Sequence, residues 1–153
     1  MEKPGILTES QYNRLLRRVD WRYILANPNP KKSVCFNNGP VKLAVAMISS
    51  SMLEPSQITN GDCELAVAIN PSRAILKSAF GALQPGGEFY SEWYSPLAGG
   101  GRGVRKRLEN IGFNDVTCYW CWPPPVDASP LFWLPLNSRW IYAFLITNQL
   151  RSR

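Results

Sequence analysis

Residues 63–93 read CELAVAINPSRAILKSAFGALQPGGEFYSEW and hold the pattern that decides the fold. Residues 64–70 are almost continuously apolar, which is typical of a strand buried on both faces of a parallel sheet. Pro71 suits the first turn of a helix over residues 72–83, and Asn70 is the expected N-cap of that helix. The sequence therefore predicts a strand–helix unit with residues 64–70 in the middle of a parallel sheet.

Shorter elements follow in the same alternating order. Gln84–Gly87 predicts a turn, and residues 88–93 alternate as a strand does. A basic amphipathic helix is predicted over residues 104–113, ended by Gly112, and another strand is predicted over residues 114–122. The apolar stretches FWLPL and WIYAFLI are expected to add strand material near the C-terminus.

Residues 33–52, which precede this unit, are expected to form a first strand, a turn and a helix. Residues 33–37 are β-prone, Asn38-Gly39-Pro40 predicts a tight turn, and residues 41–52 read as a helix that is apolar on most sides. Strand, glycine turn and buried helix are the opening of a Rossmann-type unit. The whole order predicts a truncated, Rossmann-like, three-layer α/β sandwich. Its sheet is expected to be mostly parallel, with a C-terminal antiparallel addition.

The N-terminal residues form an amphipathic helix and a connector. Residues 8–19 place apolar side chains at helical spacing, whereas the prolines of residues 26–32 forbid a helix there. We therefore expect residues 1–153 to form one domain. Residues 1–30 are its expected helical cap and connector.

The composition excludes several kinds of catalytic machinery and of location. The 153-residue chain has no histidine, which rules out Ser-His-Asp and Cys-His catalytic devices and histidine zinc ligands. No apolar run reaches the roughly 18–20 residues that cross a bilayer, and the first ten residues lack a signal-peptide core. The sequence predicts a cytoplasmic protein that does not bind membranes.

The cysteines are predicted to be structural. Cys35 and Cys63 lie inside apolar, strand-like stretches, where a thiol acts as a small hydrophobe. Cys118 and Cys121 form a C-x-x-C motif, but the chain has no further C-x-x-C or histidine to complete a zinc site. Their aromatic, strand-like setting also differs from the helix N-terminus of a redox pair. No metal site is predicted.

The order of motifs from residue 63 to residue 113 resembles class I S-adenosylmethionine-dependent methyltransferases. The likeness rests on an acid at the start of a buried strand, an L-x-P-G-G turn before the next strand, and a helix that ends in Gly-Phe. In this chain these motifs are Asp62 or Glu64, Leu83–Gly87 and Gly112-Phe113. The resemblance implies a Rossmann-like fold, S-adenosylmethionine as cofactor and methyl transfer, so we expect residues 1–153 to form a single methyltransferase-like domain.

Five residues are candidates for binding that cofactor, because they follow strands at the edge where α/β proteins collect ligands. They are Asn37, Asn38, Gly39, Asn70 and Pro71. Glycine lets a ligand approach the backbone closely, and asparagine tolerates left-handed backbone. Purely structural roles stay open: a strand–helix turn at Gly39, and a helix start at Asn70 and Pro71.

The spacing between Gly39 and Glu64 predicts a degenerate cofactor site. The resemblance implies a second strand that ends in an acid, which holds the ribose hydroxyls. Only 24 residues separate Gly39 from Glu64, and we expect one helix and a loop there. Glu54 is the only acid in this interval before Asp62, and it precedes a proline in the predicted loop. Weak or absent binding of S-adenosylmethionine is therefore expected.

The formal charge of +6 arises from 17 Lys and Arg against 11 Asp and Glu, and the cations are clustered. A solvated face explains most such clusters, whereas a phosphorylated ligand or nucleic acid is the alternative. The chain contains no recognised nucleic-acid module, so nucleic acid is not the expected partner.

Two functions fit the sequence. The first is methyl transfer to a small molecule, with any general base drawn from Asp20, Glu92 or Tyr94; no catalytic residue is singled out. The second is a non-catalytic Rossmann-like module that binds a protein partner, with a homodimer as a further alternative. Trp93 is expected in the core. The remaining aromatic and proline residues of the C-terminal part are assigned to the core, a lid or a dimer surface: Trp120, Trp122, Pro123–Pro125, Trp133 and Trp140.

Overall fold

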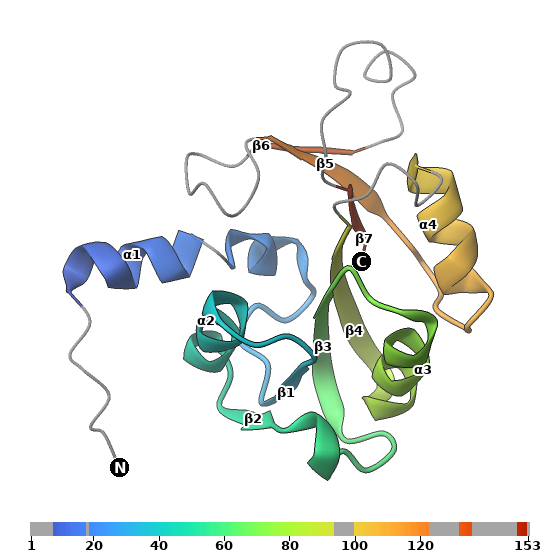
Figure 1. Ribbon diagram of the computed structural model, residues 1–153, viewed down its shortest axis with the longest axis horizontal. Helices are drawn as coiled ribbons and strands as arrows, with labels where there is room; N and C mark the ends of the chain where they lie inside the picture. Colours follow the sequence, from blue (N-terminus) through green and yellow to red (C-terminus); the bar gives the residue numbers. More distant parts are fainter. Residues whose placement is uncertain (1–7, 18, 94–99, 123–131, 136–149, 153) are drawn as a thin grey trace.

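The computed structural model describes residues 8–17, 19–93, 100–122, 132–135 and 150–152 (Figure 1). The described helices are α1 (Glu9–Arg17), α2 (Pro40–Ile48), α3 (Arg73–Ala82) and α4 (Gly100–Glu109), with 3₁₀ turns η1 (Asp20–Ile24) and η2 (Pro55–Gln57). The described strands are β1 (Lys32–Cys35), β2 (Ser51–Leu53), β3 (Cys63–Ile69), β4 (Leu83–Trp93), β5 (Cys118–Trp122), β6 (Phe132–Pro135) and β7 (Leu150–Ser152).

The strands form one sheet in the order β2-β1-β3-β4-β7-β5-β6. Strands β2, β1, β3 and β4 run parallel to one another, and β3 lies between β1 and β4. Ala66 at the middle of β3 pairs with Val34 on one side and Phe89 on the other. The predictions of a central strand at residues 64–70 and of a Rossmann-like α/β fold are confirmed.

The other three strands continue the sheet beyond β4. β7 pairs antiparallel with both β4 and β5, so β5 runs in the same direction as β4. β6 pairs antiparallel with β5 at the far edge. The stretch WIYAFLI and the segment 123–130 lie outside the described residues.

Helices cover both faces of the sheet and give the molecule three layers (Figure 1). On one face, Ala66 and Ala68 of β3 pack with residues of α3 and α4 in one apolar cluster. On the other face, Leu65 and Val67 pack with α2 and with Trp21 of η1 in a second cluster. This alternation follows from the pleat of β3, because successive side chains of a strand point to opposite faces.

The helix predicted over residues 41–52 ends earlier, at Ile48, and a strand follows it. Ser49 has extended backbone, and its hydroxyl donates to the carbonyl of Val45 at 2.8 Å. The Ser51 N–H then donates to the Lys31 carbonyl, which starts the pairing of β2 with β1. The expectation of one helix and a loop between Gly39 and Glu64 was therefore wrong. Serine side chains form hydrogen bonds with nearby backbone groups and so compete with the helix, which favours its end at Ile48.

The start of α3 also differs from the expectation. Asn70 has a φ of 46°, which is incompatible with the extended backbone of an N-cap. Ser72 caps the helix instead, since its hydroxyl accepts a hydrogen bond from the Ile75 N–H at 3.3 Å. Pro71 is buried before the helix begins rather than standing at its first position.

The L-x-P-G-G segment belongs to β4, where it forms a bulge. Cys63 pairs with Leu83, and the register shifts before Leu65 pairs with Glu88. A Cβ at Gly87 would lie 2.9 Å from the carbonyl oxygen of Cys63, so this position requires glycine. The predicted turn is thus a strand irregularity rather than a separate loop.

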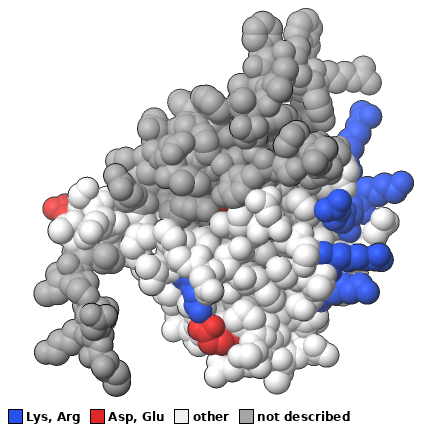
Figure 2. Space-filling model, in the orientation of Figure 1, with Lys and Arg blue, Asp and Glu red and all other residues white. Residues whose placement is uncertain are grey.

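The basic helix α4 begins at Gly100 rather than at residue 104 and ends at Glu109. Figure 2 shows that Lys and Arg side chains gather on one side of the molecule, over α3 and α4. None of the described helices is long and apolar enough to span a membrane.

Candidate functional site

The four parallel strands end at one edge of the sheet, and polar residues lie at or directly after each of these ends. Asn37–Gly39 follow β1, Glu54 follows β2, and Asn70 follows β3. Glu92 lies near the end of β4. The carboxyl edge of a parallel sheet is where ligands bind in open α/β folds, so this edge is the candidate site.

Asn37 holds the ends of β1 and β3 together. Its Oδ1 accepts a hydrogen bond from the Ile69 N–H at 2.6 Å, and its Nδ2 donates to the Ile69 carbonyl at 3.4 Å. Its own carbonyl accepts from the Cys35 thiol at 3.3 Å. One side chain thus serves both backbone groups of a residue on the neighbouring strand. This fixes the positions of Asn38 and Gly39, both of which are exposed.

Gly39 is the N-cap of α2 and leaves open space above it. Its φ of 82° and ψ of −151° lie in a region that only glycine occupies without strain. A Cβ at this position would meet no atom within 4 Å. No side chain caps the helix at this residue. The open backbone and the positive end of the helix dipole face the edge where a ligand would lie.

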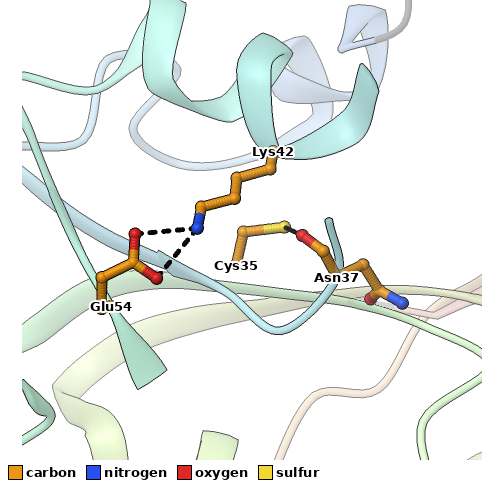
Figure 3. A network of polar contacts seen from close by, with 4 residues as sticks. All are labelled: Cys35, Asn37, Lys42 and Glu54. Carbon is orange, nitrogen blue, oxygen red and sulfur yellow. Dashed lines mark hydrogen bonds and ion pairs between the residues drawn. The ribbon is translucent and has the colours of Figure 1, made fainter. Parts of the chain in front are cut away.

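Glu54 and Lys42 form the main charged pair of this edge (Figure 3). Lys42 reaches from α2 to the residue that follows β2, and its Nζ lies 2.8 Å from each carboxylate oxygen of Glu54. The Glu54 side chain remains 51% exposed. The sequence pattern placed this acid in a loop because it did not reveal β2. The run Ser49-Ser50-Ser51 was the signal that could have ended the helix and shown the strand.

Asn70 joins β3 to β4 at the same edge. Its N–H donates to the Glu92 carbonyl at 2.7 Å, and its side chain is exposed. Because Asn37 binds Ile69, the residue before Asn70, these two asparagines lie at adjacent strand ends. The sequence-predicted residues Asn37, Asn38, Gly39 and Asn70 therefore share one edge, whereas Pro71, which follows Asn70, is buried.

The acid and aromatic residues of β4 are buried. Glu92 is fully buried and its Oε1 accepts from the Tyr90 hydroxyl at 2.8 Å. Trp93 is 4% exposed, and its Nε1 donates to Ser91, which confirms the predicted core position. Trp21 stacks on Tyr90 with ring centroids 3.7 Å apart. This contact docks η1 on the sheet. The side chains of Asp20 and Tyr94 lie outside the described residues, as do those of the four C-terminal tryptophans and of Pro123–Pro125.

The described thiols are buried and poorly suited to act as nucleophiles. Burial raises the pKa of Cys63 above its ordinary value of 9.0, with a further increase from Asp62. Burial also raises the pKa of Cys118, against an opposing effect of Arg105. Cys35 is buried too, which confirms the expectation for Cys35 and Cys63. Among the described residues no three His, Cys, Asp or Glu side chains gather as metal ligands. The side chain of Cys121 is not described.

Comparison with known proteins supports the fold. No protein-family model matches the chain, and no curated protein matches it. Among solved structures, it is similar to a SAM-dependent methyltransferase from Thermotoga maritima, described as a possible histamine N-methyltransferase. The TM-score is 0.56 and the identity 7%, over 91% of this chain and 87% of that one.

A second similar structure is a SAM-dependent O-methyltransferase from the same organism. The TM-score is 0.54 and the identity 9%, over 99% of this chain and 67% of the other. At such low identity the likeness shows the fold and nothing beyond it. The chain has the Rossmann-like α/β fold that these methyltransferases have.

Proposed function

We propose that this protein binds S-adenosylmethionine at the carboxyl edge of β1, β2 and β3 and transfers its methyl group to a small molecule. The observation that carries the proposal is Glu54, a carboxylate that directly follows β2 beside the glycine turn of β1. The resemblance to class I methyltransferases implies an acid at the end of a second strand to hold the ribose hydroxyls. The chain supplies one where none was expected from its spacing.

The chemistry of Glu54 fits that task. A carboxylate has about four lone-pair sites, and Lys42 occupies one direction on each oxygen. The remaining sites can accept two hydroxyl protons, as vicinal ribose hydroxyls would require. The ion pair orients the carboxylate through a lysine that is only 24% exposed. The Glu54 carboxylate is therefore held in one orientation by Lys42 and is still accessible to a ligand.

The glycine turn fits the amino-acid part of the cofactor. Open space above Gly39 would admit a ligand close to the backbone, and the start of α2 would favour a carboxylate there. Pro40 at the first helical position leaves one backbone donor fewer for this purpose. The exposed side chains of Asn38 and Asn70 provide donors and acceptors after β1 and β3.

S-adenosylmethionine, when bound, supplies an electrophilic methyl group on a sulfonium. Alignment of an acceptor with that methyl group is the main requirement of such a transfer, so the chain's contribution is to bind and orient. Glu92 is buried and bonded by Tyr90, and this arrangement favours a structural role over that of a general base. We assign no catalytic residue.

Calorimetric titration with S-adenosylmethionine tests the proposal on the wild-type chain and on Glu54→Gln. Loss of a charge-assisted hydrogen bond costs about 1.5–3 kcal/mol, so binding should weaken about 10- to 100-fold. Asp62→Asn is the matched control. It also removes an exposed acid that pairs with a lysine, but it precedes β3 at the opposite edge. Its affinity should stay within about twofold of wild type.

A glycine pair provides a second comparison. Gly39 and Gly61 both have positive φ and open space, yet only Gly39 lies at the candidate edge. Alanine at either position strains the backbone by about 1–3 kcal/mol, but only Gly39→Ala should weaken cofactor binding. Equal affinities in wild type, Glu54→Gln and Gly39→Ala would place the pocket elsewhere. A wild-type chain that binds no cofactor would favour the non-catalytic module that binds a protein partner.

A further inference from the structure

A groove of about 600 Å³ lies between α3 and α4, apart from the candidate cofactor site. Its described lining residues are Arg73, Gly103, Lys106, Arg107, Asn110 and Ile111. Arg73 stands at the start of α3, and the others come from α4 and the turn after it. None of these six residues is acidic, so three cations share one concavity without a carboxylate in its described wall.

The surface around the groove extends the same charge. α3 carries Arg73 and Lys77, and α4 carries four cations with Glu109 as its one acid. Figure 2 shows this band of Lys and Arg, with no acidic side chain among them in that view. Like charges held together raise the local potential, which attracts and steers an anionic partner.

Two of the α4 cations already have contacts that hold them. The guanidinium of Arg107 lies 5.3 Å from the ring centroid of Trp93. The positive charge of Arg105 interacts with the Cys118 thiol and lowers its pKa, against the larger effect of burial. Within the described part of the chain, Arg73 and Lys106 take part in no salt bridge. Both side chains are exposed. These two cations on opposite walls of the groove are available to a ligand.

We propose that this groove binds the phosphate backbone of a single nucleic-acid strand. Cations on both walls of a concavity suit a narrow chain that carries charge along its length. Lys77 and Arg102 prolong the band beyond the groove along both helices. No described aromatic side chain lines the groove, so binding should depend on phosphates and tolerate changes of base sequence. The sequence alone offered no nucleic-acid module; the placement of Arg73 beside α4 is a tertiary feature.

The proposal does not depend on methyl transfer. The groove and the Glu54 edge share no lining residue, and the nucleic-acid measurement requires no cofactor. Loss of S-adenosylmethionine binding in Glu54→Gln should leave strand binding unchanged. Failure of one proposal is therefore distinguishable from failure of the other.

Fluorescence anisotropy with a labelled single-stranded RNA of about 12 nucleotides, and with DNA of the same sequence, tests the proposal. The groove variant is Arg73→Gln/Lys106→Gln, which spares the Arg107 contact with Trp93. The control is Lys31→Gln/Lys32→Gln, which removes the same charge from exposed residues at the start of β1. Thermal melting of both variants checks that the fold is retained.

Each cation that no longer neutralises a phosphate lowers the salt slope by about 0.7, so the two substitutions lower it by about 1.4. Over the tenfold change in salt from 1 M to 0.1 M, this slope amounts to about 25-fold weaker binding of the strand by the groove variant at 0.1 M salt. Its salt dependence should fall by about 1.4 in slope, while the affinity of the control changes less than about threefold. Binding of RNA and of DNA with these effects supports a backbone site. Equal losses of affinity in the two variants would overturn the proposal. The proposal would also be overturned if poly-glutamate or pyrophosphate displaced the labelled strand as effectively as unlabelled strand does at the same concentration of charge.

Discussion

Replacement of Trp21 by alanine should remove one of the largest contributions to the core. Trp21 is fully buried and lies parallel to Tyr90, with ring centroids 3.7 Å apart and an interplanar angle of 7°. Aromatic side chains bury about 150–250 Å² each, at about 25 cal/mol per Å². Alanine retains part of this contribution but leaves a cavity, so we expect Trp21→Ala to lower the free energy of unfolding by about 3–5 kcal/mol. This is a large share of the roughly 5–15 kcal/mol of a typical domain.

Urea denaturation followed by far-UV circular dichroism measures this loss. Tyr23→Ala is the matched control, because it removes an aromatic ring from the same 3₁₀ turn at a residue that is 68% exposed. Its effect should be about 0.5 kcal/mol or less. Trp21→Phe preserves a ring against Tyr90 and should fall between the two. Equal losses for Trp21→Ala and Tyr23→Ala would refute the docking of η1 on the sheet.

Three further predictions concern polar and thiol groups. Asn37→Ala leaves the Ile69 N–H and carbonyl without their side-chain partner and should cost about 1–3 kcal/mol of unfolding free energy, measured by urea titration. Because burial raises the pKa of Cys63 and Cys118 in the folded state, the folded chain retains these thiol protons to a higher pH than the unfolded chain does. Their stabilising contribution is complete below the ordinary pKa of 9.0 and is lost as pH rises above it, so unfolding free energy should fall less steeply there in a Cys63→Ala/Cys118→Ala variant. Cys118 and Cys121 should bind no metal, and stoichiometric zinc in purified protein would contradict this.

The central part of the fold was predictable from sequence because its signals are local and strong. The apolar run of β3 needs burial on both faces, which places it in the middle of the sheet. The strand β2 was missed because three residues show neither period nor alternation, and its burial depends on pairing with β1. Periodicity carries no information at that length.

The candidate site was predictable in outline and incomplete in detail. The edge that holds Asn38, Gly39 and Asn70 follows from the order of strands and turns. The hydrogen bonds of Asn37 with the Ile69 backbone depend on which strand lies beside β1, and no local sequence pattern reveals this. Glu54 was assigned to a loop for the same reason, since its placement depends on the strand before it.

The position of β3 between two apolar clusters has a consequence for local opening. Its side chains contribute to the core on both faces, so its amide hydrogens should exchange with solvent only when the whole protein unfolds. β2 lies at the edge of the sheet with no fully buried residue. Its amides should exchange through local fluctuation that leaves β3 intact. Glu54 thus follows the least protected of the parallel strands, and a ligand held by its carboxylate would be detected as slower exchange in β2.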